Sequence, residues 1–361
     1  MIEQIERAIE RQDYPGATSL LQKLMQQEPE NPWSDYYVAR LQEANGELQT
    51  AIESYRLLLR VALNPTITSK ARQRIDRITK IKQQQREKAL ANSLAEPGNS
   101  EIGVLILEKI SPELKQTAAQ KFAKIMSIDP YNARLQLPSR SWRLYRTGKL
   151  GELKFYSSSL KKAEIPCFYA SLAEIDRLKI YQVNYFESTI PKVTVVCYGR
   201  RGQQNKLIFD WQEVAQQVEG LLPVFDASLH SDVRGKIYRK SETIDYVQLR
   251  DLHLPGKKII LRLCDRNYQF KKGISFAKKS SIEPATTRIN WNNLNKFLQQ
   301  NLSEIPIQSD FTPFAETAID FEEILRRIEP NINLLRREDS FWDAAFELYS
   351  GLIFLRNFQL H

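Results

Sequence analysis

Histidines and glycine-rich loops are the first places to look for chemistry in this chain. The three histidines are His230, His253 and His361. None has a second histidine at the H-x-x-x-H or H-E-x-x-H spacing, which places two imidazoles around zinc on one helix face. The 13 glycines form neither G-x-x-x-x-G-K-[ST] nor a strand-linked G-x-G-x-x-G, so no phosphate-binding loop is predicted. The sequence therefore predicts no catalytic residue, no metal and no cofactor, and a chain that is not an enzyme.

Paired carboxylates can also perform general acid–base work or hold a metal. They occur in DFEEIL (320–325) and in REDSFWD (337–343). Both segments begin or lie within predicted helices, where carboxylates in the first turn interact favourably with the helix dipole. We therefore interpret both clusters as charges that stabilise helix starts.

Two groups of basic residues have the chemistry to contact phosphate, because Arg and Lys neutralise phosphate while aromatic rings stack on bases. The first group is interleaved with Trp142, Tyr145 and Tyr156, and its central members are predicted to form a basic surface. These members are Arg140, Arg143, Arg146 and Lys149, within a group that also holds Arg134, Lys154, Lys161 and Lys162. The second group comprises Lys257, Lys258, Arg262, Arg266, Lys271 and Lys272.

The charge of the chain is concentrated around the first basic group. Net charge is +9 over 361 residues. Residues 101–200 hold 16 basic and 9 acidic side chains, and so carry seven of these nine excess charges. A basic domain attracts nucleic acid, acidic protein or an anionic membrane surface. The alternative is a basic face that only contacts solvent.

Composition limits the compartment and the number of domains. The length suggests two to four domains, and 42% apolar residues are enough for packed cores. Cys167, Cys197 and Cys264 lie far apart in apolar, strand-like runs and form no C-x-x-C pair. Reduced, buried cysteines and a charged N-terminus predict a cytoplasmic protein. No apolar run approaches ~18 residues, so no transmembrane helix is expected, although peripheral membrane association is possible.

Two helical hairpins are predicted over residues 1–92. Residues 32–65 read as two antiparallel helices around Gly46, and residues 1–31 match them at a constant offset of 34. The matched positions include Ala17 with Ala51, where a small residue lets two helices approach, and Leu21 with Tyr55, which fill the groove so formed. Residues 68–93 continue as one helix with a narrow apolar stripe, which suits a terminal cap.

The 34-residue unit resembles a tetratricopeptide repeat. The chain departs from that pattern at Asp35, Gln42 and Leu63, and the alternative is a plain helical hairpin bundle. The resemblance implies a concave groove lined by the first helix of each repeat. It therefore places the partner-binding residues at Trp33, Tyr36, Tyr37 and Arg40.

Residues 103–177, after a linker at 93–102, are predicted to form a small basic α/β domain. From Ala118 to Ser171 the predicted order of elements is similar to the C-terminal domain of the bacterial ribosomal stalk protein. The counterparts are AAQKFAKIM, DPYNARLQL, SRSWRLYRTGK, LGELKFYSSSLKKA and EIPCFYAS. The first turn lacks most of that family's glycines and lysines, so the resemblance implies the fold and not the recruitment of translation factors.

Residues 178–310 are predicted to form a mostly β domain, because six segments rich in β-branched and aromatic residues are bounded by turn signals. One of these segments is NYQF (267–270), and a helix is expected near 212–220. Another helix is predicted over 289–302. Residues 311–361 are predicted to add helices near 314–328 and 338–355, docked on the β domain. The expected fold class is therefore multidomain α+β.

The sequence favours a non-enzymatic adaptor, scaffold or assembly factor that binds a protein partner through its helical repeats, with the basic domain as a second contact surface. The alternatives are an RNA- or DNA-binding protein that uses residues 134–162, and an enzyme of unknown type in residues 178–310. The segments SDFTPFAETAIDFEEIL and LYSGLIFLR resemble repeat proteins of cyanobacteria. That resemblance implies a role in building or regulating a photosynthetic or cell-surface assembly.

Overall fold

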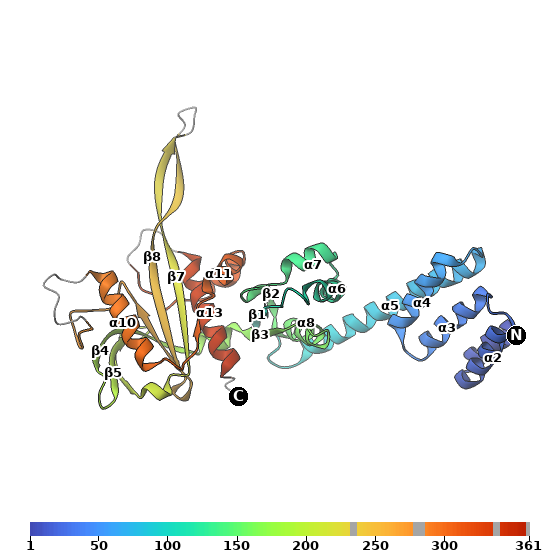
Figure 1. The fold of residues 1–361 in the computed structure, drawn as a ribbon, viewed down its shortest axis with the longest axis horizontal. Coiled ribbons are helices and arrows are strands. Elements are labelled where there is room, and N and C mark those ends of the chain that lie inside the picture. Colours follow the sequence, from blue (N-terminus) through green and yellow to red (C-terminus); the bar gives the residue numbers. More distant parts are fainter. Residues whose placement is uncertain (232–236, 277–285, 335–339, 359–361) are drawn as a thin grey trace. The chain divides into compact units, whose positions relative to one another are not determined.

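The chain folds into two compact units, residues 1–92 and residues 93–361. The computed structural model describes residues 1–231, 237–276, 286–334 and 340–358, and side chains in 227–241 lie outside the description. The first unit is helical and the second contains two sheets, so the predicted mixed α+β class is confirmed (Figure 1). The boundary falls where the helical repeats were predicted to end. The predicted linker 93–102 and the segments 103–177, 178–310 and 311–361 together make up the second unit.

The first unit is built from five helices. They are α1 (Ile2–Glu10), α2 (Tyr14–Gln27), α3 (Pro32–Ala44), α4 (Leu48–Val61) and α5 (Pro65–Ala95), the last of which runs into the second unit. Helices α2 and α4 both have 14 residues and begin 34 residues apart. Ala17 and Ala51 are fully buried, as the offset predicted, and Leu21 and Tyr55 lie in the same core.

Local signals explain where these helices begin and end. The Asn31 side chain accepts a hydrogen bond from the Trp33 amide at the start of α3, and Asn64 does the same for Thr66 at the start of α5. Gly46 ends α3 with φ of +83°, the left-handed conformation that costs glycine least. Each of these helix ends thus has a local chemical cause, and the turn at Gly46 is the one that the sequence predicted.

A three-stranded antiparallel sheet, order β2-β1-β3, opens the second unit. Its strands and helices follow the order β1 (Ile102–Leu107), α6 (Lys115–Met126), α7 (Pro130–Gln136), β2 (Arg143–Lys149), α8 (Leu150–Lys162), β3 (Cys167–Ser171) and α9 (Leu172–Asp176). This is the element order that the sequence predicted between Ala118 and Ser171. One face of the sheet packs against α6 and α8, where Phe122 and Leu160 are fully buried.

A seven-stranded sheet of order β10-β7-β8-β9-β4-β5-β6 forms the rest of the β structure. Its strands are β4 (Lys179–Ser188), β5 (Val193–Tyr198), β6 (Gln204–Phe209), β7 (Gln216–Ser231), β8 (Ile237–Leu254), β9 (Ile259–Cys264) and β10 (Ile307–Gln308). Strands β4 and β9 are parallel. Strand β9 pairs with β8 only from Leu249 to Leu254, so the hairpin of β7 and β8 extends beyond it as an arm (Figure 1).

Two predictions for this region were wrong. Residues 212–220 form no α-helix, because the short 3₁₀ turn η1 (Trp211–Glu213) leads directly into β7. Residues 267–270 form no strand; the Tyr268 hydroxyl instead accepts a hydrogen bond from the Phe186 amide of β4 at 3.0 Å. In both places the prediction assigned residues at a turn to a regular element, a helix at 212–220 and a strand at 267–270, that the structure does not contain there.

Helices lie between and outside the two sheets (Figure 1). They are α10 (Thr287–Asn301), α11 (Phe311–Ala318), α12 (Glu322–Leu325) and α13 (Phe341–Asn357). One apolar core joins α11 and α13 to both sheets, while α10 covers the opposite face of the larger sheet. The helix predicted near 314–328 is divided into α11 and α12. The predicted docking of the last helix is confirmed, since twelve of the 17 residues of α13 are buried.

Burial on all sides forces the polar residues of α13 to find partners inside the protein. Glu347 pairs with Arg262 of β9, whose guanidinium also binds Asp251 of β8 through two hydrogen bonds of 2.9 and 2.8 Å. Ser350 donates to Asp251 at 2.6 Å and lies 3.0 Å from Nε2 of His253. All five side chains are at most 1% exposed. We call this set the buried charge network.

Its histidine is held in the neutral form. Because Ser350 donates its proton to Asp251, Nε2 of His253 is the donor to Ser350, and Nδ1 has no hydrogen-bond partner in the described residues. Burial lowers the pKa of His253 to about 4 and Arg262 contributes to the decrease, although Asp251 opposes it.

Replacing Ala51 with Trp should destabilise the helical unit. Ala51 is fully buried, so a larger side chain overpacks the α3–α4 contact at a cost of ~1–3 kcal/mol or more. Urea unfolding of the full chain, followed by helical circular dichroism, measures this change. Thr50→Trp is the matched control, because Thr50 is exposed on the same helix. Equal unfolding curves for the two variants would contradict the packing described here.

Stability of the second unit should fall as pH decreases from about 6.5 to 4. Unfolded His253 binds a proton near its ordinary pKa, whereas the folded protein does not until about pH 4. The unfolded state therefore holds more protons in this window, and lowering pH from 7 to 5 should remove about 2 kcal/mol. His253→Gln, which cannot titrate, should lose less stability over the same range in urea titrations. Identical pH dependence for both proteins would show that His253 is not held neutral.

Candidate functional site

Helices α1, α3 and α5 share one polar face in the helical unit. Tyr37 donates a hydrogen bond to Glu6 of α1 at 3.3 Å, and Glu6 also lies 3.6 Å from the Lys70 ammonium of α5. Lys70 in turn lies over the Trp33 ring, 5.2 Å from its centroid. We call this surface the α1–α3–α5 face. It is the side on which the first helices of the hairpins meet.

The two predicted tyrosines are packed inside this face. Tyr36 and Tyr37 are 3% and 1% exposed and lie in the core of the helical unit. Burial, with a smaller contribution from Glu6, raises the pKa of Tyr37 above its ordinary value. The prediction that both rings line an open groove was therefore wrong, because ring–ring contacts with Trp33 and Tyr55 hold them inside. Trp33 and Arg40 remain partly exposed.

A shared carboxylate organises the charged part of the face. Glu43 accepts from Arg40 at 2.9 Å and from the Tyr55 hydroxyl at 3.1 Å, and lies 3.5 Å from Arg74 of α5. Burial disfavours the charge on Arg40, but Glu43 outweighs this effect and the pKa of Arg40 is raised. One carboxylate between two guanidinium groups leaves an excess positive charge on the face.

Glu6, Lys70 and Arg74 were not predicted as part of this face, although the 34-residue offset points to Glu6 and Arg74. Moving 34 positions from Arg40 leads back to Glu6 and forward to Arg74. The three residues therefore occupy the same position in α1, α3 and α5. Extending the offset into the long fifth helix would have identified them.

The basic residues of the second unit are brought together by a bulge in β2. Arg143 lies opposite Leu107 and Arg146 opposite Leu105, and the pairing shifts at Tyr145 between them. Directly opposed residues of an antiparallel pair point to the same face. Arg143 and Arg146, three positions apart, therefore share the face that packs on α6 and α8, whereas a regular strand would direct them to opposite faces.

The predicted basic surface is only partly assembled. Arg146 binds Glu152 at 2.6 Å and stacks over Tyr156, so its charge is balanced. Lys149 pairs opposite Ile102, which places it on the other face of the sheet, and Arg140 is exposed outside the strand. Arg143 and Arg146 line a surface pocket of about 360 Å³ between α7, β2 and the residues after α11.

A different basic cluster surrounds Arg143. Burial lowers the pKa of Lys115 at the start of α6, and the nearby charges of Arg134 and Arg143 lower it further. Lys115 hydrogen-bonds to Ser139 and Arg143 to the carbonyl of Leu135. Positive charges this close together repel one another, so they favour the binding of an anion between them. We call Lys115, Arg134 and Arg143 the basic cluster.

Three members of the second basic group are paired with carboxylates. Arg262 belongs to the buried charge network, while Arg266 pairs with Asp245 and Lys257 with Glu213. Each of these charges is balanced by a carboxylate.

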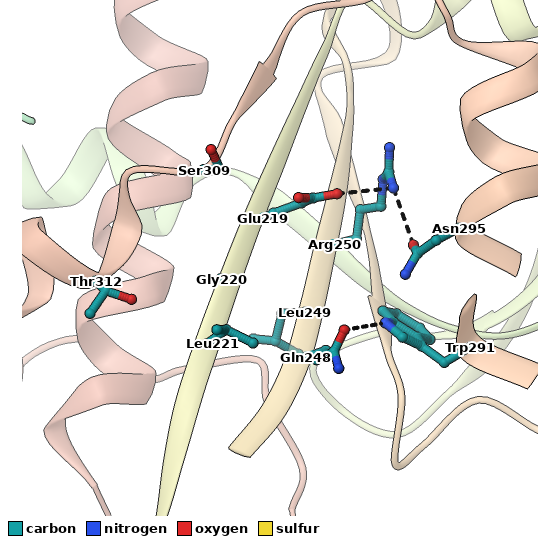
Figure 2. A pocket seen from close by; sticks show the side chains of 10 residues that line it. All are labelled: Glu219, Gly220, Leu221, Gln248, Leu249, Arg250, Trp291, Asn295, Ser309 and Thr312. Carbon is teal, nitrogen blue, oxygen red and sulfur yellow. Dashed lines mark hydrogen bonds and ion pairs between the residues drawn. The ribbon is translucent and has the colours of Figure 1, made fainter. Parts of the chain in front are cut away.

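A pocket of about 240 Å³ lies between β7, β8 and α10 (Figure 2). Its polar groups already bind one another: Arg250 contacts Glu219 at 2.9 Å and Asn295 at 3.1 Å, and the Trp291 indole donates to Gln248 at 2.9 Å. Burial lowers the pKa of Arg250, and Glu219 opposes that effect. The arrangement fixes α10 to the sheet.

Residues with metal or catalytic potential are dispersed. In the described part of the chain, no three His, Cys, Asp or Glu side chains gather in a metal-binding arrangement. His361 and the His230 side chain lie outside the described residues. Glu322 lies in the first turn of α12 and pairs with Arg326, and Asp343 lies in the first turn of α13. Both acidic clusters thus contribute to helix starts, although residues 337–339 are outside the description.

Two further properties concern the whole chain. Cys167, Cys197 and Cys264 are buried free thiols, and burial raises the pKa of Cys264 to about 11. Among the described residues, no helix combines the length and apolar character required to cross a bilayer.

Comparison with known proteins adds no relationship to this geometry, since no protein-family model, no curated protein and no solved structure matches the chain.

Proposed function

We propose that the protein is a non-enzymatic adaptor or assembly factor, with tetratricopeptide-like helices that hold a protein partner on the α1–α3–α5 face. The observation that supports this proposal most strongly is the repetition of one position in three helices, Glu6, Arg40 and Arg74, on a common surface. A repeated position on successive first helices is what an extended binding surface of stacked hairpins requires.

The partner that suits this face is an acidic segment. Trp33 offers a partly exposed aromatic surface, and Lys70, Arg40 and Arg74 offer cationic donors beside it. Tyr37 and Tyr55 are buried beneath the face, and Tyr55 donates a hydrogen bond to Glu43. This role replaces the direct contacts with a partner that were expected of Tyr36 and Tyr37. Buried free thiols are consistent with the reducing, cytoplasmic location that we propose for this adaptor.

The basic cluster supports a second candidate function, the binding of single-stranded RNA or DNA through the middle of the chain. Lys115, Arg134 and Arg143 are close enough for their charges to affect one another, and the pocket beside them is lined by Arg143 and Tyr145. In the adaptor proposal the same cluster is a second contact surface for acidic protein.

Reversing charge on the α1–α3–α5 face should abolish partner capture. The Lys70→Glu, Arg74→Glu variant places two carboxylates beside Glu6 and Glu43 and should reduce the yield of captured partner at least tenfold. Affinity capture with the full chain, quantified by mass spectrometry, measures the effect.

Lys23→Glu with Arg60→Glu is the matched control, because it makes the same charge change at exposed positions of α2 and α4. The control variant should retain the unfolding curve of the original protein, and the curve of the charge-reversed variant is measured beside it because that variant loses the Arg74–Glu43 contact. If the two variants capture the same proteins in equal amounts, the α1–α3–α5 face is not the binding surface.

Salt dependence separates the two candidate functions. If the basic cluster clamps phosphates, affinity for a single-stranded RNA should fall linearly with log salt, with a slope of about −0.7 per phosphate neutralised. Changing Lys115, Arg134 and Arg143 to Gln should then reduce the slope by about 2 units. Fluorescence anisotropy across a salt series provides the measurement.

Changing Lys149, Lys161 and Lys162 to Gln removes the same charge from exposed positions and is the matched control. An equal decrease in slope for both triple variants would indicate a diffuse charge effect. It would exclude a phosphate site at the basic cluster.

A further inference from the structure

A third pocket, of about 400 Å³, lies beside β4 and beyond the carboxyl end of β9. Ile180 of β4 packs with Phe354 of α13, and Gln182, two residues later, points to the same face of the sheet. The strand bulges between Val183 and Tyr185, which gives the chain an extra residue at Asn184. Both amide side chains line the pocket. Bulges of this kind redirect a side chain next to a site.

Gln182 and Asn184 are the unusual feature of this pocket. Both side chains are mostly buried, at 9% and 7% exposed, and both line the pocket. Within the described part of the chain neither side-chain amide makes a hydrogen bond, and neither belongs to the enclosed polar groups that lack a partner, so these amides open into the pocket and are available to a ligand. The pocket in Figure 2 shows the opposite situation, because its guanidinium and indole groups are paired within the chain.

The opposite wall of the pocket is held rigidly. The Asn331 side-chain amide donates to the Ile180 carbonyl at 2.5 Å. The backbone N–H of Asn331 donates to Glu347 of the buried charge network at 3.3 Å. Asn267, just after β9, donates to the Asn333 carbonyl at 2.6 Å. These bonds leave the Asn267 side-chain oxygen facing the same pocket with acceptor capacity. The amides of Gln182 and Asn184 therefore share the pocket with Asn267 and Asn331, which hydrogen bonds within the chain hold in place.

Charge in the pocket is balanced. Arg200, which follows β5, binds Asp176 at 2.6 Å and lies 3.7 Å from Glu347. With a carboxylate on each side, this guanidinium provides no excess positive charge for a phosphate. The pocket is thus suited to a neutral ligand that has both donors and acceptors.

We propose that this pocket binds a nucleobase, either in a free nucleoside or unpaired in a single strand. A carboxamide presents a donor and an acceptor side by side, which matches the paired donor and acceptor on a base edge. Tyr198 lies directly opposite Gln182 across the β4–β5 pair, so its ring lines the same pocket and offers a surface for stacking. The volume is within the range of small-molecule sites.

The first experiment is a calorimetric titration of the full chain with adenosine, guanosine, cytidine, uridine and ribose. At least one nucleoside should bind saturably and ribose should not. A single-stranded octamer of the preferred base, titrated in parallel, distinguishes the two sources of the base. Tighter binding of the octamer indicates a polymer, and equal or weaker binding indicates the free nucleoside. Absence of saturable nucleoside binding at millimolar concentration, or equal binding of ribose, would overturn the proposal.

The variants Gln182→Glu and Asn184→Asp keep the shape of each side chain and remove its N–H donors. Each should weaken nucleoside binding at least tenfold. Gln308→Glu makes the same change at an exposed position of β10 and should bind normally. Tyr198→Leu tests stacking independently of the amides, and it should also weaken binding. If binding is unchanged in all three pocket variants, the base occupies another site and the proposal fails.

Discussion

The second unit depends on the pairing of Arg262 with Asp251 and Glu347. Helix α13 lies between two sheets and has no face in solvent, so its one fully buried glutamate must be neutralised from inside. Taking an ion pair out of water costs several kcal/mol per ion, and the cost is offset only when the remaining hydrogen-bonding groups are also satisfied. Here the bidentate bond to Asp251 and the Ser350 hydroxyl complete the set. Because the partners come from β8, β9 and α13, the network fixes the helix against the strands.

The same network also holds Asn331, which follows α12. Glu347 accepts from the Asn331 amide as well as from Arg262, and it lies near Arg200 at the end of β5. The Glu347 carboxylate, which binds Arg262 in the core, therefore also contacts Asn331 and Arg200 in two walls of the pocket that Gln182 and Asn184 line. Close packing contributes as well, since a Cβ at Gly351 would lie 2.9 Å from Ile175 of α9. These contacts hold the walls around the pocket into which the Gln182 and Asn184 amides open.

Local patterns predicted local structure well. The 34-residue offset, the caps and Gly46 all report on contacts between neighbours in sequence, and the helices follow them. Non-local contacts were not accessible in this way. Arg262 was interpreted as one of six basic residues with the chemistry to contact phosphate, since its partner Glu347 lies 85 residues away. Tyr36 and Tyr37 were placed in a groove because the repeat pattern identifies the helix face but not the depth to which neighbouring rings bury each residue. The bulge that unites Arg143 with Arg146 also has no sequence signature.

The distinction between satisfied and unsatisfied polar groups offers a general criterion for reading such a chain. Arg250, Arg146 and Arg262 are charged and conspicuous in the sequence, but each is paired within the protein and serves to join elements. Gln182 and Asn184 are neutral and inconspicuous, yet their side-chain amides open into a pocket and make no hydrogen bond to the described residues. Such amides keep their donors and acceptors available to a ligand. Two such amides in one strand therefore mark a site more specifically than Arg250, Arg146 and Arg262 do, because pairing within the protein already accounts for these three arginines.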